Sequence, residues 1–222
     1  MISVIVPALN EAEGIVSTLQ RLQAIRAGGH EVLLVDGGSR DATVELARPY
    51  VDGVLHSGRG RALQMNTGAD AARGDILWFV HADTLVPEDA DARILEAVDA
   101  GRDWGWFRVR ILGRSRWLPV IAWFMNRRSC LTRVATGDQG VFMRRAAWDA
   151  VGGFPVIPLM EDIAISKGLR RRFRGRCLAA RLATSGRRWE QRGVARTVWL
   201  MWRLRLAYFL GADPAVLAQR YR

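Results

Sequence analysis

The stretch Gly74-Asp75-Ile76-Leu77-Trp78-Phe79-Val80-His81-Ala82-Asp83-Thr84 contains an apolar run that leads directly into a His-x-Asp pair. A short continuous apolar run is typical of a strand buried on both faces, as in a parallel sheet. Ligands bind outside the carboxyl ends of such strands, so His81 and Asp83 stand where this kind of sheet places its chemistry. An imidazole and a carboxylate on one side of an extended chain can hold a divalent cation. The alternative is that Asp83 caps the helix expected from Pro87, or orders the turn before it.

The segments around this run alternate between the patterns of strands and helices. Apolar, β-branched stretches predict three further strands in the first half of the chain, at 2–6, 31–35 and 54–55. Helical spacing and capping residues predict helices between the strands, one opening at Asn10 or Glu11 and later ones over 62–72 and 87–100. This alternation predicts an α/β fold, with a doubly wound, mostly parallel sheet, right-handed crossovers and flanking helices.

The second half of the chain is less regular. Strand patterns occur at 106–112 and 141–143, and a helix is expected from Glu161 to the arginines at 170–172. A long apolar helix with embedded arginines is expected over 194–210. We therefore divide the chain into a domain at 1–190 and a helical C-terminal extension at 191–222.

Composition narrows the classes of protein that fit. Half of the 222 residues are hydrophobic, which suits a globular α/β domain with an extension. The formal net charge is +11, and Lys167 is the only lysine among 33 basic residues. Such a protein favours anionic partners, namely nucleotides, nucleic acid or acidic lipids. Cys130 and Cys177 lack metal-site spacing, and neither a signal peptide nor a membrane span is evident, so we expect reduced thiols and a cytoplasmic protein.

Acidic and polar clusters follow the expected strands in a fixed order. They are Val4-Ile5-Val6-Pro7-Ala8-Leu9-Asn10-Glu11, Val35-Asp36-Gly37-Gly38-Ser39-Arg40-Asp41-Ala42-Thr43, Asn66-Thr67-Gly68-Ala69, His81-Ala82-Asp83 and Glu161-Asp162. Together they resemble family 2 glycosyltransferases, which have the GT-A fold. The stretches 136–140 and 184–189 resemble a bacterial subgroup of uncharacterised members often found near radical-enzyme genes.

The resemblance implies a nucleotide pocket at the ends of the first two strands. Asp36 would accept hydrogen bonds from the base or ribose of a nucleotide-sugar donor, with turn chemistry as the alternative. Family members often have a second acidic residue where Gly37 stands here. The same pocket would be lined by Pro7, Ala8, Asn10 and Glu11. Glu11 can equally be a first-turn helix carboxylate.

The resemblance also places basic and amide side chains near the diphosphate. Arg59 and Arg61 lie in a glycine-bounded loop that precedes Asn66. Family members often have an arginine where Met65 stands, so Arg61 would substitute for it at the diphosphate. Asn66 is also expected to bind substrate. The alternative is a solvated basic loop.

Asp83 corresponds to the last aspartate of the family's Asp-x-Asp motif, which holds Mn²⁺ or Mg²⁺ against the diphosphate. His81 stands at the first position of that motif, and a histidine suits Mn²⁺ better than Mg²⁺. His81 is therefore either a metal ligand or a contact to the ribose or phosphate.

Asp162 matches the family's catalytic base, which removes the acceptor's proton in an inverting transfer. Glu161 would support it or contact the acceptor, and Asp138 and Gln139 carry groups that match sugar hydroxyls. The alternative for Glu161 and Asp162 is an acidic helix N-terminus. The element 187–189 loosely resembles the Arg-Trp element of processive relatives.

Two Trp-rich stretches flanked by arginine, at 117–125 and 194–210, suit a membrane interface, a core helix or a homodimer contact. We expect a metal-dependent, inverting transferase that moves a sugar from a UDP-linked donor to an acceptor hydroxyl, with a lipid-linked acceptor at the inner membrane face. The alternatives are a nucleotidyltransferase, which would usually have a Gly-rich basic loop after the first strand, and a non-catalytic protein that binds membrane or nucleic acid. The last accounts for the charge but not for the ordered acidic clusters.

Overall fold

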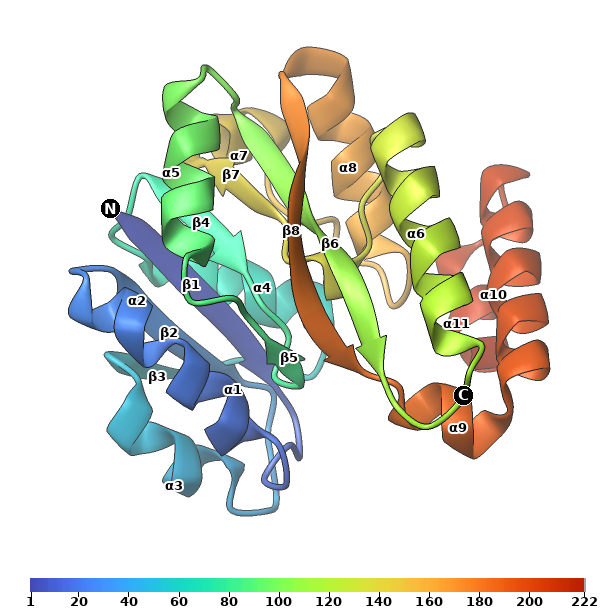
Figure 1. Cartoon of the computed structure of the whole chain (residues 1–222), viewed down its shortest axis with the longest axis horizontal. Coiled ribbons are helices and arrows are strands. Elements are labelled where there is room, and N and C mark those ends of the chain that lie inside the picture. The colour runs from blue at the N-terminus through green and yellow to red at the C-terminus, as the bar shows by residue number, and fades with distance from the viewer. Residues whose placement is uncertain (222) are drawn as a thin grey trace.

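Four neighbouring parallel strands form the N-terminal half of a mixed eight-stranded sheet (Figure 1). The computed structural model describes residues 1–221, except for the side chain of Arg188. These four strands are β1 (Ile2–Ala8), β2 (Glu31–Asp36), β3 (Gly53–His56) and β4 (Ile76–Phe79). The helices among them are α1 (Ile15–Arg21), α2 (Gln23–Ala27), α3 (Thr43–Ala47), the 3₁₀ turn η1 (Arg48–Tyr50) and α4 (Arg61–Ala71). The strands predicted in this half are confirmed, whereas the first helix begins later than expected.

The other half of the sheet mixes directions. The complete order is β3-β2-β1-β4-β7-β6-β8-β5. Its strands are β5 (Thr84–Leu85), β6 (Trp104–Leu112), β7 (Phe142–Arg144) and β8 (Gly175–Ser185). Strand β7 is antiparallel to both β4 and β6, while β6 and β8 run parallel. The mixed α/β, parallel-dominated architecture is as predicted, but β8 and β5 were not foreseen.

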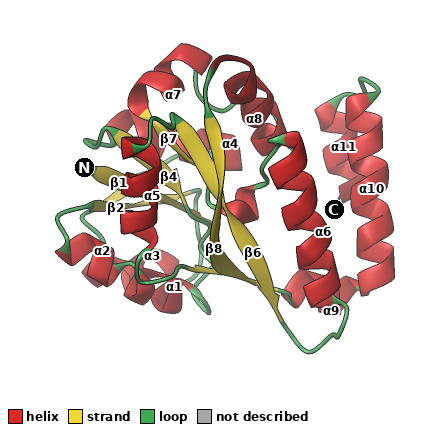
Figure 2. Cartoon of the chain, turned by 45° about the horizontal axis from the view of Figure 1, so that its top comes forward, coloured by secondary structure: helices red, strands yellow, loops and turns green. Residues whose placement is uncertain are grey.

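Helices cover both faces of the sheet (Figures 1 and 2). They include α5 (Ala90–Asp99), α6 (Leu118–Thr132), the 3₁₀ turn η2 (Gly137–Gln139), α7 (Arg145–Val151) and α8 (Glu161–Arg172). Along β1, Val4 and Val6 pack with α1 and α5, whereas Ile5 packs with α4 on the opposite face. Because both faces are buried, the strand is apolar throughout, as the sequence pattern indicated.

Three helices end the described part of the chain, and the last two of them pack on residues around the start of α8. These helices are α9 (Arg187–Arg192), α10 (Val194–Phe209) and α11 (Pro214–Tyr221). Leu204 of α10 and Leu217 of α11 form a small apolar cluster with Val134, Met160 and Ile163. The expected helical extension therefore reaches the loops near α8. Among the described residues, no helix has both the length and the apolar character needed to cross a bilayer.

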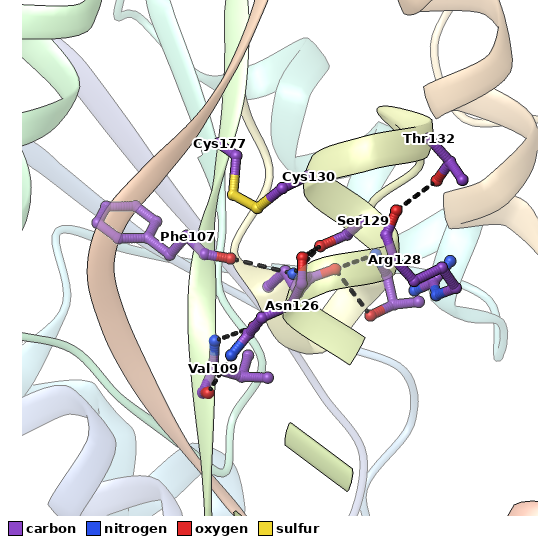
Figure 3. The surroundings of a disulfide bond; sticks show 10 residues. Phe107, Val109, Asn126, Arg128, Ser129, Cys130, Thr132 and Cys177 are labelled. Carbon is purple, nitrogen blue, oxygen red and sulfur yellow. Dashed lines mark hydrogen bonds between the residues drawn. A yellow bond between two sulfur atoms is a disulfide. The ribbon is translucent and has the colours of Figure 1, made fainter. Parts of the chain in front are cut away.

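The expectation of two reduced thiols is wrong for this structure. Cys130 of α6 and Cys177 of β8 form a disulfide, with their Cα atoms 5.4 Å apart (Figure 3). The two cysteines are far apart in the sequence, but α6 packs against the β6–β8 strand pair and brings them together. Sequence spacing alone cannot reveal such a tertiary contact.

Candidate active site

The loops after β1 and β2 are joined to each other by hydrogen bonds. Asn10 adopts a left-handed conformation, with φ 55°, and its side-chain oxygen accepts a hydrogen bond from the backbone N–H of Arg40 at 2.9 Å. Its backbone N–H donates to the Ser39 hydroxyl at 2.9 Å. Asn10 is thereby held outside α1, which begins at Ile15. Pro7 and Ala8 are buried in β1 just before this loop.

Asp36 ends β2 and organises the turn that follows it. Its carboxylate accepts hydrogen bonds from the backbone N–H groups of Gly38 and Ser39, at 3.1 Å. Burial acts to raise the pKa of Asp36, but the hydrogen bonds from Ser39 and Gly38 outweigh burial and hold that pKa below its ordinary value. His56, at the end of β3, lies 3.6 Å from the carboxylate. Asp36 is thus a buried, oriented carboxylate that also performs the turn role considered above.

His81 follows β4 and contacts the η2 turn. Its Nδ1 lies 3.3 Å from the carboxylate of Asp138, and its Nε2 is buried without a hydrogen-bond partner among the described residues. A Cβ added to Gly137 would lie 2.5 Å from Nε2. Nδ1 therefore faces Asp138, and Nε2 lies beside Gly137.

Asp162 and Glu161 stand at the first turn of α8. One carboxylate oxygen of Asp162 accepts the backbone N–H of Gly137 at 2.8 Å, and the other accepts that of Ile163 at 2.7 Å. Glu161 is buried and lies 3.6 Å from Arg61 of α4. Burial raises the pKa of Glu161, neighbouring Asp162 raises it further, and Arg61 opposes the rise.

A small cavity joins these groups. The residues that line it are Arg61, Met65, Phe79, His81, Gly137, Val141, Phe154, Glu161 and Asp162. The start of α4, the end of β4, the segment from η2 to β7, the loop at Phe154 and the start of α8 therefore meet around Asp162.

Asp83 and Glu11 are the carboxylates available for a metal. Burial raises the pKa of Glu11, and the charge of Asp83 raises it further, whereas Arg187 at 3.8 Å lowers it. Hard carboxylate oxygens suit Mn²⁺ and Mg²⁺. No group of three His, Cys, Asp or Glu side chains within the described part of the chain could hold a metal. These residues fit a metal bound by one or two protein carboxylates and completed by oxygens of a bound diphosphate.

The helix boundaries exclude two of the alternative roles considered from the sequence, a helix cap for Asp83 and a first-turn position for Glu11. Asp83 does not cap α5, whose N-cap residue is Asp89. Glu11 does not lie in the first turn of α1, which contains no acidic residue.

Two of the side chains expected to bind substrate, Asn66 and Gln139, form hydrogen bonds within the fold. The amide of Asn66 donates to the backbone oxygen of Phe154 at 2.9 Å and accepts the backbone N–H of that residue at 3.0 Å. Gln139 is fully buried; its amide nitrogen donates to Phe107 and Ser129, and its oxygen accepts hydrogen bonds from Thr136. These two residues hold the loops on which Gly137 and Phe154 stand.

Sequence reasoning missed two residues near this site, Arg128 of α6 and Arg205 of α10. The charge of the Asp162 carboxylate acts on both guanidinium groups and opposes the lowering of their pKa values by burial. The sequence feature that could have indicated these two residues is the presence of arginines within otherwise apolar helices. In the element at 187–189, the Arg187 guanidinium forms ion pairs with Glu11 and Glu13. The side chain of Arg188 lies outside the described residues.

The sheet and its strand-end carboxylates define an α/β protein with its ligand site at the carboxyl edge of the parallel strands. Comparison with known protein families identifies the family to which the chain belongs. The profile of glycosyl transferase family 2 matches residues 3–150, which is about two thirds of the chain. The chain therefore belongs to glycosyl transferase family 2.

Curated relatives share about a quarter to a third of the aligned residues. The poly-beta-1,6-N-acetyl-D-glucosamine synthase of Staphylococcus aureus is 28% identical, over 86% of this chain and 52% of that protein. The undecaprenyl-phosphate 4-deoxy-4-formamido-L-arabinose transferase of Aeromonas hydrophila is 28% identical, over 65% of this chain and 48% of that protein. The chain thus spans about half the length of these relatives.

Solved structures show the same fold at lower identity. The mannosyltransferase PcManGT from Pyrobaculum calidifontis, in complex with GDP-Man and Mn²⁺, has a TM-score of 0.68 and 22% identity, over 93% of this chain and 60% of that one. S. aureus TarS 1–349, in complex with UDP-GlcNAc, has a TM-score of 0.65 and 19% identity, over 83% of this chain and 58% of that one. These likenesses establish the GT-A fold.

Proposed function

We propose that this chain transfers a sugar, with inversion, from a UDP-linked donor to the hydroxyl group of an acceptor. The observation that carries the proposal is the placement of Asp162 in a cavity beside the strand-end residues of the parallel sheet. Family membership supports the class of reaction, and the complexes of similar folds with UDP-GlcNAc and GDP-Man support a nucleotide-sugar donor.

The donor would lie along the ends of β1, β2 and β4. The Asp36 carboxylate is oriented to accept hydrogen bonds from the base or ribose, and the rigid loop at Asn10 borders the same edge. Arg61, now 3.6 Å from Glu161, has a guanidinium that suits the diphosphate. Asn66 and Gln139 act as positioning residues in this scheme.

Asp162 would serve as the general base. The acceptor oxygen forms a bond to the anomeric carbon as the bond from that carbon to the diphosphate oxygen breaks, and Asp162 takes the acceptor's proton. The backbone N–H groups of Gly137 and Ile163 fix the direction of its carboxylate. The leaving group departs as the nucleoside diphosphate.

A divalent metal, Mn²⁺ or Mg²⁺, would neutralise the charge that develops on the leaving diphosphate. Asp83 is the residue proposed to hold the metal, with Glu11 beside it, and the Mn²⁺ complex of the similar mannosyltransferase fold supports this assignment. His81 is better placed as a contact that orients Asp138 and the η2 turn.

We also propose that the acceptor is presented at an anionic membrane surface, the inner face of the cytoplasmic membrane. Exposed aromatic residues recur at helical spacing on α10, at Trp199, Trp202 and Phe209, and others lie exposed on α6. Arg203 lies over the ring of Trp199, which pairs an interfacial aromatic with a cation for lipid headgroups. The net charge of +11 complements acidic lipids.

The first experiment is thermal stabilisation by UDP, GDP, CMP and their sugars, with and without Mn²⁺, followed by assay of nucleotide release. A ligand that binds only the folded state raises its stability. We expect a Mn²⁺-dependent shift with UDP that is lost in Asp83→Ala. Asp162→Asn should keep this shift and lower UDP-sugar turnover by about 10²–10⁴-fold, the usual contribution of a general base.

The matched control is Asp70→Asn, which changes an exposed carboxylate on α4 and should leave both measurements unchanged. Normal turnover in Asp162→Asn would remove that residue from the mechanism. A folded protein that no nucleotide stabilises would contradict the proposed activity.

A further inference from the structure

Two arginines that the proposed mechanism leaves unused come from different helices, and the charge of Asp162 acts on both of them. Arg128 comes from α6 and extends away from the Cys130–Cys177 disulfide (Figure 3). Its Nη1 donates to the backbone oxygen of Val134 at 3.4 Å. Arg205 comes from α10, which lies beside α6 at the same end of the molecule (Figures 1 and 2).

The guanidinium groups retain buried N–H donors. Nε and Nη2 of Arg128 and Nε of Arg205 are inaccessible to solvent, and none of them has a hydrogen-bond partner among the described residues. Buried donors without partners are rare in folded proteins because their lost hydration is not replaced. Three such donors on two neighbouring side chains indicate that a ligand completes this site.

The charges around the pair are also unbalanced. Burial and, to a lesser extent, the charge of Arg205 lower the pKa of Arg128 to about 10, although Asp162 opposes the change. The nearby carboxylates have other partners: Asp162 accepts two backbone N–H groups, and Glu161 pairs with Arg61. Asp138, whose charge also acts on Arg205, lies 3.3 Å from His81. Within the described part of the chain, neither Arg128 nor Arg205 forms an ion pair, so two like charges lie together near Asp162.

We infer that Arg128 and Arg205 bind a phosphate monoester on the acceptor and thereby hold its reacting hydroxyl against Asp162. A phosphate monoester carries a charge near −2, which balances two guanidinium charges. Its three terminal oxygens match three free N–H donors, and guanidinium groups are well suited to phosphate. This inference rests on the proposed function and specifies its acceptor. A neutral glycan would leave the two guanidinium charges opposed only by the carboxylates of Asp162 and Asp138, and would bring no anion to the buried donors.

The phosphate site is tested first with inorganic phosphate as the probe. Isothermal titration and thermal shift would compare the wild-type chain with Arg128→Gln and Arg205→Gln. Matched controls are Arg127→Gln and Arg196→Gln, which change exposed arginines on the same two helices. We expect phosphate to bind the wild type and both controls, and to bind each inner variant about tenfold more weakly or worse, as expected for the loss of a charge-assisted contact.

Stability without phosphate separates ligand binding from a structural role. If the arginines bind an anion, either inner variant should be at least as stable as the wild type without ligand, since the change relieves repulsion. A structural role predicts lower stability and unchanged phosphate affinity. Arg128→Lys keeps the charge without the planar fork, so it should fold and bind phosphate with an affinity between those of the wild type and Arg128→Gln.

The source of the phosphate is distinguished by two further probes. One is glycerol 3-phosphate in solution, and the other is a phosphatidylcholine vesicle that contains dodecyl phosphate. Binding that depends on Arg128 and Arg205 supports the site with either probe and identifies a soluble or a lipid-borne acceptor. Equal phosphate affinity in the inner variants and controls, or no binding by the wild type, would overturn the inference.

The UDP and Mn²⁺ shift is measured on the same samples. Its retention in every arginine variant would show that the donor site is intact, so that a loss of phosphate binding belongs to the acceptor site. If no nucleotide binds but phosphate still binds through these arginines, the proposed function fails while the anion site stands.

Discussion

At the residue scale, the contact between Gly137 and His81 leaves no room for a side chain at position 137. A Cβ there would lie 2.5 Å from both Cε1 and Nε2 of the imidazole. The ring is largely buried, and its Nδ1 lies 3.3 Å from the carboxylate of Asp138, so a shift of the ring would disturb this contact. The backbone N–H of Gly137 also donates to Asp162. Displacement of Gly137 would therefore disturb both His81 and Asp162.

We predict that Gly137→Ala destabilises the protein by about 1–3 kcal/mol, the usual cost of overpacking, and lowers turnover as well. Urea denaturation measures the change. The control is Gly168→Ala within α8, where the added Cβ would meet Val151 at an ordinary 3.7 Å. That variant should gain about 0.5–1 kcal/mol from helix propensity. Equal stability changes in the two variants would contradict the packing argument.

Glu161 makes stability depend on pH. Its pKa in the folded chain is raised by burial and by Asp162. Between the ordinary carboxyl pKa and this raised value the folded state binds more protons than the unfolded state, so stability falls as pH rises through that window. We predict that Glu161→Gln is more stable than the wild type at neutral pH and that this advantage disappears in acid.

Denaturation at several pH values checks this prediction. Glu88→Gln, which changes an exposed carboxylate, serves as the control and should leave the pH profile as it is. A neutral-pH stability of Glu161→Gln below that of the wild type would show that its pairing with Arg61 outweighs burial.

Site residues that stand at the end of a strand or the start of a helix could be predicted from the sequence. Asp36 and His81 follow apolar strands directly, and Asp162 opens a helix with a clear start. The role of Asn66 was not predictable, because its partner Phe154 is distant in the chain and is brought near only by folding. Arg205 was missed for the same reason, since its position depends on how α10 packs.

At the scale of elements, the side chain of Asn126 links α6 to β6 by hydrogen bonds (Figure 3). Its side-chain oxygen accepts the backbone N–H of Val109 at 2.8 Å, and its amide nitrogen donates to the oxygen of that residue at 2.9 Å. The register of β6 against β8 shifts between Phe107 and Arg108, next to this attachment. A side chain thus supplies hydrogen bonds where the pairing of strands is irregular.

We predict that Asn126→Ala costs about 1–3 kcal/mol, because it leaves backbone groups of β6 without partners. Hydrogen exchange should show faster exchange of the Val109 amide than in the wild type. Asn126→Asp retains the acceptor and serves as the matched comparison. Unchanged protection of Val109 in Asn126→Ala would contradict this role of the side chain.

The strands that were foreseen are those with continuous apolar sequence. β8 reads Gly-Arg-Cys-Leu-Ala-Ala-Arg-Leu-Ala-Thr-Ser, where arginines interrupt the apolar pattern. Short β5 is a strand only because it pairs with β8. α6 was recognised as an apolar stretch, but its helical form follows from packing on β6 and β8 rather than from a clear amphipathic period.

At the scale of the whole molecule, positive charge and exposed aromatic residues act together. Trp202 is 73% exposed, although tryptophan is mostly buried in folded proteins. It shares α10 with Arg205, which approaches Asp162. One helix would therefore connect a membrane surface to the acceptor side of the cavity.

We predict that the protein sediments with phosphatidylglycerol-containing vesicles and less with pure phosphatidylcholine, and that added salt weakens this binding. Trp202→Ala should reduce vesicle affinity by about tenfold, because an inserted indole contributes roughly 1–2 kcal/mol. Leu46→Ala, a change of an exposed apolar residue on α3, is the control. No vesicle binding together with concentration-dependent dimerisation would assign the aromatic surface to a homodimer instead.

The order of the sheet has a consequence for how the protein forms during synthesis. β1 to β4 are consecutive in the chain and neighbours in the sheet, so the nucleotide side can assemble while the ribosome still holds the remainder. β5 must wait for β8, since Thr84 pairs with Thr184, and Arg205 emerges later still. A chain interrupted before α10 would therefore lack Arg205, so under the proposed mechanism the donor side would form before the acceptor side.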